Sequence, residues 1–335
     1  MIRDILPKLK SKASLSAEEM SGAMEDIVSG RAGGGDIENF LLALREKGET
    51  VSEIVSAAKV MRSHALHLSK NYPELLDTCG TGGDNQRTFN VSTLSALVAC
   101  ACGVKVGKHG NRSVSSLCGS ADLLEMLGIK IDLLPAQIEK SIEKTGFGFF
   151  FAPLFHPATK FAMTARKKIS GKTIFNILGP LSNPAGAAHQ LVGVYEEKLV
   201  SIFAEALLKL GSQRAMIVHG KEGLDEISIS GETLAAEISG GRIKNYTIKP
   251  EELGFKLSPI ASLRCDSKEK SHEEAVKILK GEKSSRSDIV CLNAAAALWV
   301  AEKASTLKQG VAIVREALES GAVLKKLEQI IHYDS

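Results

Sequence analysis

The chain has 335 residues and is nearly balanced in charge, with 42 Lys and Arg against 39 Asp and Glu and a formal net charge of +3. Such a small excess, without a basic block interleaved with aromatic residues, argues against nucleic acid or a membrane surface as a partner. Six cysteines lack the spacing of a disulfide framework and indicate a reducing compartment. Because no apolar run reaches 18 residues and no cleavable leader is recognisable, we expect a soluble, cytoplasmic protein.

The first seventy residues show only helical patterns, and each helix has recognisable start and stop signals. A Ser or Thr followed three residues later by Glu is typical of a capping box, and Gly commonly ends a helix. The expected starts and ends are Ser16 with Glu19 and then Gly30, Asp36 and then Gly48, and Thr50 with Glu53 and then about Leu68.

Two of these helices carry more apolar surface than a unit of seventy residues is expected to bury. Ile37, Phe40, Leu41 and Leu44 recur on one face of the helix that precedes Gly48. The next helix adds Val51, Ile54, Val55, Ala58, Val60 and Met61. We therefore expect a homodimer that pairs through the helical domain. The alternative is that these helices simply pack on one another and on the rest of the chain.

From Leu75 onward the pattern changes to short apolar runs that alternate with helical ones, which is typical of a mainly parallel sheet covered by helices. The expected strands are 75–77, 104–106, 129–131, 147–151, 191–194 and 215–218. Residues 157–180 again look helical, without a strand. The predicted fold is therefore α/β, with a small all-helical N-terminal domain and a larger domain whose mainly parallel central sheet is flanked by helices.

The most informative segment, from Leu75 to Ser92, reads LLDTCGTGGDNQRTFNVS. A short apolar run leads into three glycines within four positions and then into the hydroxyl-rich start of a helix. Backbone N–H groups in such a turn, and at the following helix N-terminus, bind phosphate, and glycine permits the close approach. The alternative is a turn that merely joins a strand to a helix. The residues concerned are Gly80, Gly82, Gly83, Asp84, Asn90, Ser92 and Thr93.

A second polar segment, VKVGKHGNRSVSSLCGS at 104–120, also follows an apolar strand-like run. It is rich in donors and poor in charged acceptors, so its natural partner is an anion. A solvated surface loop would explain its polarity but not its place after a buried strand. Two such loops indicate a ligand with two separated phosphate groups. The donors are Lys108, His109, Asn111, Arg112, Ser113, Ser115 and Ser116.

A pair of adjacent carboxylates, Asp225 and Glu226, lies in a loop after the apolar run 215–218. Beside an anion site these carboxylates would repel the ligand unless a cation lay between them. Mg²⁺ is suited to this place because it binds a few carboxylates together with phosphate oxygens and water. Taken alone, the pair would favour the alternative, an ordinary acidic surface turn.

Together these segments resemble the anthranilate phosphoribosyltransferase family, over nearly the whole chain and in the family's order. The matching strings are DTCGTGGD at 77–84, FNVST at 89–93, KHGNRSVSS at 108–116, CGSADLLEMLG at 118–128, TIFNILGPLSNP at 173–184 and VHGKEGLDEIS at 218–228. The resemblance implies transfer of the phosphoribosyl group of phosphoribosyl pyrophosphate (PRPP) to the amino group of anthranilate, in tryptophan biosynthesis. It also implies two domains, one of residues 1–70 joined by about 157–185, the other of 73–156 and 186–335.

The resemblance assigns ligand roles to residues at the matching positions. PRPP would contact Gly80, Gly83, Asp84, Thr88, Asn90, Val91, Ser92, Thr93, Lys108, His109, Gly110, Asn111, Arg112, Ser113, Val114, Ser115, Ser116 and Ser120. Anthranilate would contact Gly80, Asn111 and Arg166, with His109 and His156 lining its path. Two Mg²⁺ ions are implied, one held by Ser92 and Glu226 and one by Asp225 and Glu226.

Three positions depart from the family pattern: Asn85 where glycine is frequent, Arg87 where a small residue is expected, and Lys172 where arginine is common. Two other functions stay open. A pyrimidine nucleoside phosphorylase would share the architecture, but the intact KHGNR and GLDE strings speak against it. A non-catalytic paralogue that binds nucleic acid is disfavoured by the balanced charge and by the complete set of candidate metal ligands.

Overall fold

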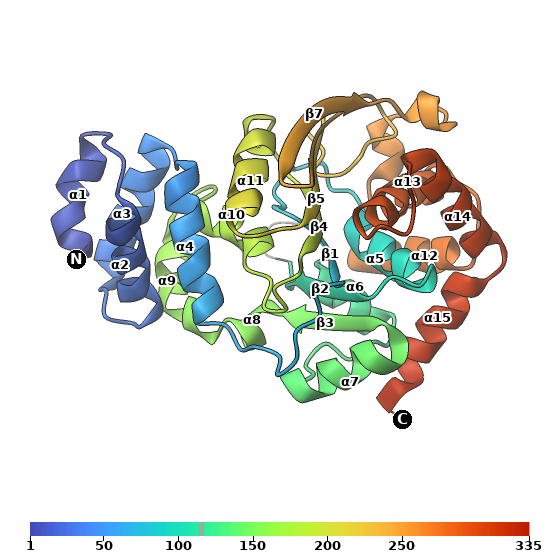
Figure 1. Cartoon of the computed structure of the whole chain (residues 1–335), viewed down its shortest axis with the longest axis horizontal. Coiled ribbons are helices and arrows are strands. Elements are labelled where there is room, and N and C mark those ends of the chain that lie inside the picture. Colours follow the sequence, from blue (N-terminus) through green and yellow to red (C-terminus); the bar gives the residue numbers. More distant parts are fainter. Residues whose placement is uncertain (114–116, 335) are drawn as a thin grey trace.

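A computed structural model describes residues 1–113 and 117–334. One seven-stranded sheet lies in the middle of the molecule, with the N-terminal helices at one end and the C-terminal helices at the other (Figure 1). This arrangement confirms the predicted fold class. Among the described residues, none of the helices combines the length and the apolarity needed to span a membrane.

The N-terminal helices begin and end close to the predicted signals. They are α1 (Ile2–Lys10), α2 (Ala17–Val28), α3 (Gly34–Lys47) and α4 (Val51–Ser63). Both capping boxes are present, at Ser16 with Glu19 and at Thr50 with Glu53. The prediction that Asp36 caps α3 is wrong, because the cap is Gly33 and the Asp36 carboxylate instead accepts a hydrogen bond of 2.9 Å from Arg3.

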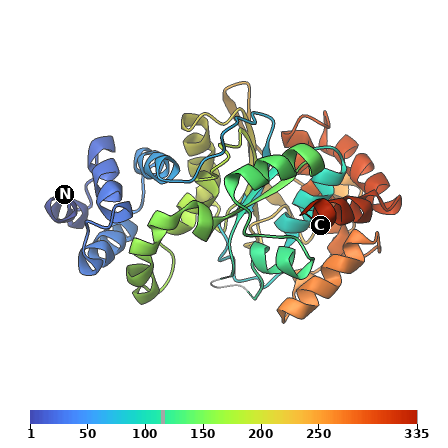
Figure 2. The same cartoon turned by 90° about the horizontal axis from the view of Figure 1, so that it is seen from below.

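The helix α4 stops five residues before the predicted end at Leu68. Its last residue is Ser63, and the N–H of Leu66 then donates to the carbonyl of Phe155 at 2.9 Å. The chain therefore leaves the helix in order to cross toward the sheet. Residues of the segment 157–180 return to the N-terminal helices, where α9 (Lys160–Lys168) packs on α2 and α3 and α10 (Ile174–Leu181) packs on α4 (Figure 2).

The sheet has the order β3-β2-β1-β4-β5-β6-β7. Its strands are β1 (Leu76–Gly80), β2 (Val106–Gly110), β3 (Phe147–Phe151), β4 (His189–Gly193), β5 (Arg214–Gly220), β6 (Thr233–Ser239) and β7 (Arg242–Ile248). The first five in this order are parallel, whereas β6 and β7 are antiparallel to their neighbours. The predicted strand at 129–131 is wrong, because Ile129 and Ile131 are buried in a loop against the helix layer and pair with no strand.

The hairpin of β6 and β7 was not predicted. Its turn, Gly240–Gly241, has positive φ at both residues (56° and 71°), the geometry of a tight two-residue hairpin connection that glycine adopts without strain. The residues of β7 are mostly exposed, so the strand lacks the apolar run on which the strand predictions depended. Its alternating pattern next to a Gly-Gly pair is the signal that would have revealed it.

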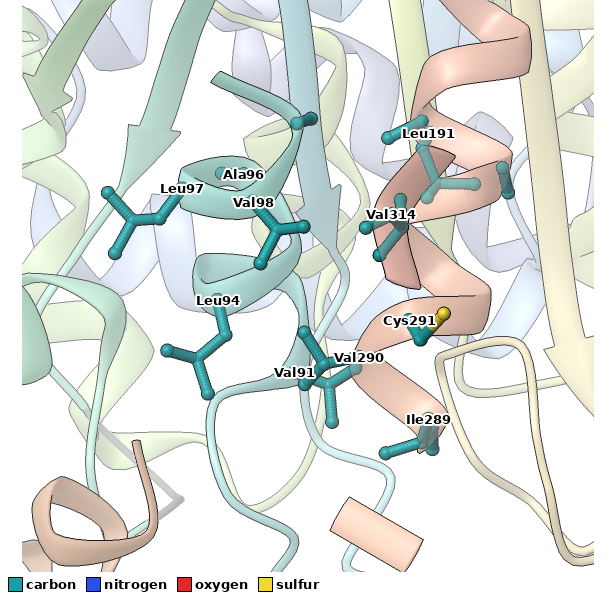
Figure 3. Close-up of a cluster of buried hydrophobic side chains, with 14 of the residues drawn as sticks. Val91, Leu94, Ala96, Leu97, Val98, Leu191, Ile289, Val290, Cys291 and Val314 are labelled. Atoms are coloured by element: carbon teal, nitrogen blue, oxygen red, sulfur yellow. The ribbon is translucent and has the colours of Figure 1, made fainter. Parts of the chain in front are cut away.

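Helices cover both faces of the sheet. They are α5 (Val91–Ala101), α6 (Ser120–Met126), α7 (Pro135–Thr145), α8 (Ala152–Phe155), α11 (Lys198–Lys209), α12 (Lys268–Leu279), α13 (Ser285–Val300), α14 (Leu307–Glu319) and α15 (Ala322–Ile331). Leu191 faces the core beneath α5 and α13 (Figure 3), and its neighbour Val192 faces the core that α4, α10 and α11 share with the N-terminal helices. This alternation is the period of two expected of a strand buried on both faces.

The connections of the sheet decide where a ligand can bind. The chain moves from β1 to β2 and β3 on one side, and from β4 to β5 on the other, so the direction of winding reverses between β1 and β4. At such a reversal the loops leaving the carboxyl ends of the two strands diverge and open a crevice. The glycine-rich turn follows β1, so it lies at this crevice.

The apolar faces on which the dimer prediction rested are buried within one chain. Ile37, Phe40, Leu41 and Leu44 are at most 1% exposed, in a core that continues into α9, α10 and α11. These four side chains are therefore not available to a partner chain, so an interface at Phe40 is wrong, while the homodimer itself stays a prediction. The helices of the N-terminal region find their apolar cover in segments that lie far away in the sequence.

We predict that Phe40→Glu unfolds the protein and yields no folded monomer. Placing a charge where the Phe40 ring is fully buried should cost about 4 kcal/mol or more. Thermal unfolding followed by circular dichroism would show a large loss of stability, whereas Glu46→Gln on the exposed side of the same helix would change little. A stable Phe40→Glu monomer would contradict this prediction.

Candidate active site

The site is centred where the acidic loop lies across the carboxyl ends of β1 and β4. Gly80 and Gly193 end these strands as a register pair. A Cβ atom on Gly80 would lie 2.7 Å from Oδ2 of Asp225, and one on Gly193 would collide with the Asp225 backbone. Glycine at both positions is therefore what allows the acidic loop to seat on the sheet edge.

The carboxylate of Asp225 lies against the glycine-rich turn. Its Oδ2 accepts a hydrogen bond of 2.9 Å from the N–H of Gly82. Burial, followed by repulsion from Asp84, raises the pKa of Asp225 to about 7. The turn and the acidic loop, 143 residues apart in sequence, thus form one cluster of charge.

The second carboxylate, Glu226, lies at the N-terminus of α5. Its Oε1 accepts a hydrogen bond of 3.0 Å from the N–H of Ser92, in the first turn of that helix. Burial and the neighbouring Asp225 raise the pKa of Glu226 well above its usual range. The helix N-terminus predicted to bind phosphate therefore also stabilises a carboxylate, since both are anions.

The oxygen atoms of these side chains are suitable ligands for a magnesium ion. Crowded, poorly solvated carboxylates need a cation, and Asp225 and Glu226 have Ser92 beside them. Within residues 1–113 and 117–334 no group of three or more His, Cys, Asp or Glu side chains is arranged as a metal site. Mg²⁺ does not require one, because it binds through one or two carboxylates and completes its shell with phosphate oxygens and water.

The polarity of KHGNR indicated that Lys108 and His109 lie in a loop. This prediction is wrong, because both residues belong to strand β2. Lys108 is only 2% exposed, and its ammonium donates a short hydrogen bond to the carbonyl of Thr78 on β1. Burial lowers its pKa, while Asp77 and Glu226 favour the charged form. The charge of Lys108 therefore acts on the carboxylate of Glu226 in the acidic loop.

The two predicted histidines lie together, with ring centroids 5.1 Å apart. Nδ1 of His109 lies 3.1 Å from the carbonyl oxygen of Gly179, and Nε2 of His156 lies 2.9 Å from that of Ser182. Burial lowers the pKa of His109 to about 3 and that of His156 to about 4, so both rings are neutral at pH 7. A carbonyl only accepts, so Nδ1 of His109 carries the proton and Nε2 is an acceptor.

Arg166 on α9 and the histidine pair both contact the region of α10. Its guanidinium stands 4.9 Å from the ring centroid of Phe175. Phe175 and Gly179 are one turn apart on α10, hence on the same face, and Gly179 is the partner of His109. The structure thus gathers Arg166, His109 and His156, which are far apart in sequence, along one side of α10.

The loop after β2 is tied to α6. The N–H of Asn111 donates to the Ser120 hydroxyl at 3.2 Å, and the N–H of Ser113 donates to Asp122 at 3.0 Å. Arg112 forms ion pairs with Asp122 and Glu125, so its charge is engaged within the chain. Val114, Ser115 and Ser116 lie outside the described residues.

The remaining predicted PRPP contacts line the same edge. Asn90 donates to the carbonyl of Cys118 at 2.9 Å, Thr88 forms an isolated bridge with Arg264, and Val91 is buried at the start of α5. Gly83 has φ of 73° in the turn, and Gly110 ends β2. Among the described residues, four buried atoms of this region lack a hydrogen-bond partner, which is typical of a ligand site. They are Asp77 Oδ2, Asp84 Oδ2, Thr93 Oγ1 and His109 Nε2.

Comparison with known proteins agrees with this geometry. Residues 3–65 match the helical bundle domain of a glycosyl transferase family, and residues 72–324 match the a/b domain of a glycosyl transferase family. The chain is 46% identical to the anthranilate phosphoribosyltransferase of Alkaliphilus metalliredigens, over 99% of this chain and 98% of that protein. The chain belongs to the anthranilate phosphoribosyltransferase family. The predicted family membership is confirmed.

Solved structures of anthranilate phosphoribosyltransferases share the whole architecture. The enzyme from Thermus thermophilus superimposes with a TM-score of 0.92 at 40% identity, over 98% of this chain and 99% of that one. The enzyme from Saccharomyces cerevisiae, solved in complex with PRPP and Mg, gives 0.89 at 28% identity, over 98% and 96%. These relatives support neither the phosphorylase nor the nucleic-acid-binding alternative.

One further residue of the candidate site was not predicted from the sequence. Asp77 is fully buried in β1, and its Oδ1 accepts a hydrogen bond of 3.2 Å from the N–H of His109. Burial raises its pKa, and the charge of Lys108 opposes that rise. The signal was an aspartate inside an apolar strand, where a carboxylate is costly unless it is partnered.

Two departures from the family pattern have a simple conformational outcome. Asn85 and Arg87 have φ of 60° and 56°, the left-handed region that glycine prefers and asparagine tolerates. Arginine has no such preference, so the turn is strained at Arg87. Its carbonyl accepts a hydrogen bond of 2.9 Å from Cys265, which holds this conformation.

We predict that Asp225→Asn stabilises the metal-free protein at pH 7.5. The raised pKa means that ionised Asp225 costs stability in the folded state, and an amide keeps an oxygen for Gly82 without the charge. We expect a melting temperature about 2 °C higher, the shift that on the order of 1 kcal/mol produces in a large domain.

The gain in melting temperature of Asp225→Asn should depend on pH. The gain should shrink as the pH falls from 7.5 toward 5, because the carboxyl of Asp225, with its pKa of about 7, becomes protonated in the folded protein. Melting curves in chelator at several pH values measure it, with the exposed Asp266→Asn as control. A destabilised variant, or a gain independent of pH, would refute the charge argument.

Proposed function

We propose that this chain catalyses the transfer of the phosphoribosyl group from PRPP to the amino group of anthranilate, with release of pyrophosphate. The observation that carries the proposal is the seating of Asp225 and Glu226 across the ends of β1 and β4, against the glycine-rich turn. A substrate bearing a diphosphate and a metal fits there. The product, N-(5-phosphoribosyl)anthranilate, belongs to tryptophan biosynthesis, which we place in the cytoplasm.

PRPP is proposed to span the edge from the glycine-rich turn to the loop after β2. The turn offers backbone N–H groups, and the N-terminus of α5 adds its dipole. Lys108 acts from below as buried positive charge, because its ammonium is engaged with Thr78. The expected contacts remain those of the turn and the two loops, together with Ser120.

Two Mg²⁺ ions per site are proposed, one held by Ser92 and Glu226 and one by Asp225 and Glu226. When bound, Mg²⁺ supplies Lewis-acid stabilisation of the departing pyrophosphate. The carboxylates also place negative charge near the ribose, where positive charge develops in a dissociative transition state. The S. cerevisiae relative was solved with PRPP and Mg, which supports the same cofactor here.

Anthranilate is proposed to bind along α10, between the histidine pair and Arg166. A planar guanidinium grips both oxygens of a carboxylate, and Arg166 is partly desolvated, which lowers its pKa. Nε2 of His109 is a neutral acceptor without a partner, and in this proposal it accepts a hydrogen bond from the aromatic amine. Gly80, Asn111 and His156 complete the expected contacts. A relative from S. cerevisiae was solved in complex with 4-fluoroanthranilate.

The chemistry requires alignment more than proton transfer. The anthranilate amine is neutral at pH 7, so it can attack the ribose carbon without prior deprotonation. His109 is a weak base because burial lowers its pKa to about 3, so it orients the amine. Catalysis then depends on the stabilised leaving group and on holding two substrates in line.

We also propose the domain division and the homodimer. Residues 1–70 with about 157–185 would form one domain, because α9 and α10 pack on α2, α3 and α4, and 73–156 with 186–335 would form the other. The apolar side chains of Phe161 and Met163 on α9 are exposed. They could contact a second copy of the chain, whereas most apolar side chains of α3 are buried. Light scattering should give about twice 35.8 kDa, and a single-chain mass would refute pairing.

The activity itself has a direct assay. We predict that anthranilate fluorescence falls when the protein is mixed with PRPP and Mg²⁺, and that chelator prevents the fall. Asp225→Asn combined with Glu226→Gln should abolish turnover while the circular dichroism spectrum is retained. Phosphorolysis of thymidine or uridine in place of this reaction, or near-normal turnover of the double variant, would overturn the proposal.

We predict that Arg166→Ala raises the anthranilate KM by about tenfold to a hundredfold, since a charge-assisted contact contributes ~1.5–3 kcal/mol. The KM for PRPP should change little. Lys168→Ala, on the exposed side of the same helix, is the matched control. If both constants rose together, Arg166 would serve the packing of α9 on Phe175 and not the substrate.

A further inference from the structure

Lys172 lies in the turn between α9 and α10, and this turn is held by the N-terminal helices. Nη1 of Arg45 on α3 donates to the carbonyls of Ser170 and Lys172, at 2.7 and 3.5 Å. Gly171 between them has φ of 90°, which only glycine adopts readily. The position of the Lys172 backbone is therefore set by the helical side of the molecule.

The side chain of Lys172 reaches the sheet side. Its Nζ lies 3.0 Å from the ring centroid of Tyr195, just after β4. Its Cε lies 2.8 Å from where a Cβ on Gly83 would be, so the absence of a side chain at Gly83 makes room for the lysine stem. The N–H of Tyr195 donates to the Thr81 hydroxyl at 3.0 Å, which ties the Tyr195 backbone to the same glycine-rich turn.

The ammonium of Lys172 is incompletely compensated there. Burial lowers its pKa, and the carboxylates of Glu196, Asp225 and Asp84 oppose that shift from a distance. In the described part of the chain no carboxylate forms an ion pair with it. The face of Tyr195 covers one side of the ammonium, which still has N–H donors to offer. A partly desolvated cation in this state is stabilised when an anion arrives.

We propose that Lys172 binds the pyrophosphate group of PRPP, as the cation that the helical side contributes to a site otherwise built on the sheet edge. The inference rests on the proposed function and extends it to a residue outside the family's matching contacts. Its place beside Gly83, within the field of Asp225, favours the diphosphate end of the substrate, since the loop after β2 is proposed to bind the other phosphate. A lysine suits this role as a compact charge with three donors.

The test is equilibrium binding by calorimetry, with Mg²⁺ present, of pyrophosphate and of ribose 5-phosphate as separate probes. Lys172→Met should weaken pyrophosphate binding by about tenfold to a hundredfold and leave ribose 5-phosphate binding within about twofold. Lys172→Arg should restore most of the pyrophosphate affinity. The matched control is Lys168→Met, which should bind both probes normally. Lys168 is an exposed residue of α9, and its Nζ lies 4.0 Å from the carboxylate of Glu38 on α3.

Several results would overturn the assignment. Unchanged pyrophosphate affinity in Lys172→Met would show that the ammonium does not contact this group. An equal loss for both probes, with no rescue by arginine, would show that Lys172 only positions the turn. If the wild-type protein turns over anthranilate and Lys172→Met binds pyrophosphate normally, the role of Lys172 is refuted but the proposed function is not. A wild-type protein that neither binds pyrophosphate nor turns over refutes the proposed function as well.

Discussion

The structure of the site depends on one close approach, that of the acidic loop to the ends of β1 and β4. Gly80 and Gly193 are paired in register, and neither has a side chain that would hold the Asp225 backbone away from the sheet. Without that approach, Asp225 would not reach the N–H of Gly82, and Glu226 would not reach Ser92 at the start of α5. Three chain segments, each unremarkable by itself, thereby become one anionic site at the reversal of the sheet.

This arrangement brings buried carboxylates close together, which is electrostatically unfavourable, and two lysines partly offset the repulsion. Lys108 is buried within the sheet and held by Thr78. Lys172 lies on the turn between α9 and α10, which Arg45 anchors to the N-terminal helices. Neither cation neutralises the cluster, since Asp225 still has a pKa raised to about 7. Residual negative charge beside the glycine-rich turn is a condition in which a bound divalent cation is favourable.

The part of the site near α10, which contains His109, His156 and Arg166, has no cluster of carboxylates among the described residues. His109 and His156 are neutral because they are buried, and both use backbone carbonyls of the α10 region to fix their orientation. Arg166 approaches the same face through Phe175. The proposed metal site thus lies on the sheet edge, and the proposed anthranilate site lies on α10, a helix that packs against α3 and α4. Relative movement of these elements would therefore alter both halves together.

The sequence by itself determined the local elements and the chemistry they carry. Capping boxes at Ser16 and Thr50, the glycine-rich turn and the adjacent carboxylates are short-range patterns, because caps and turns depend on neighbouring residues. The tertiary structure alone decided the rest. It buried Phe40 against distant helices, drew Lys108 into a strand, left 129–131 unpaired and brought Asp84 and Lys172 to Asp225. These outcomes depend on contacts between residues far apart in the chain, and no local pattern encodes such contacts.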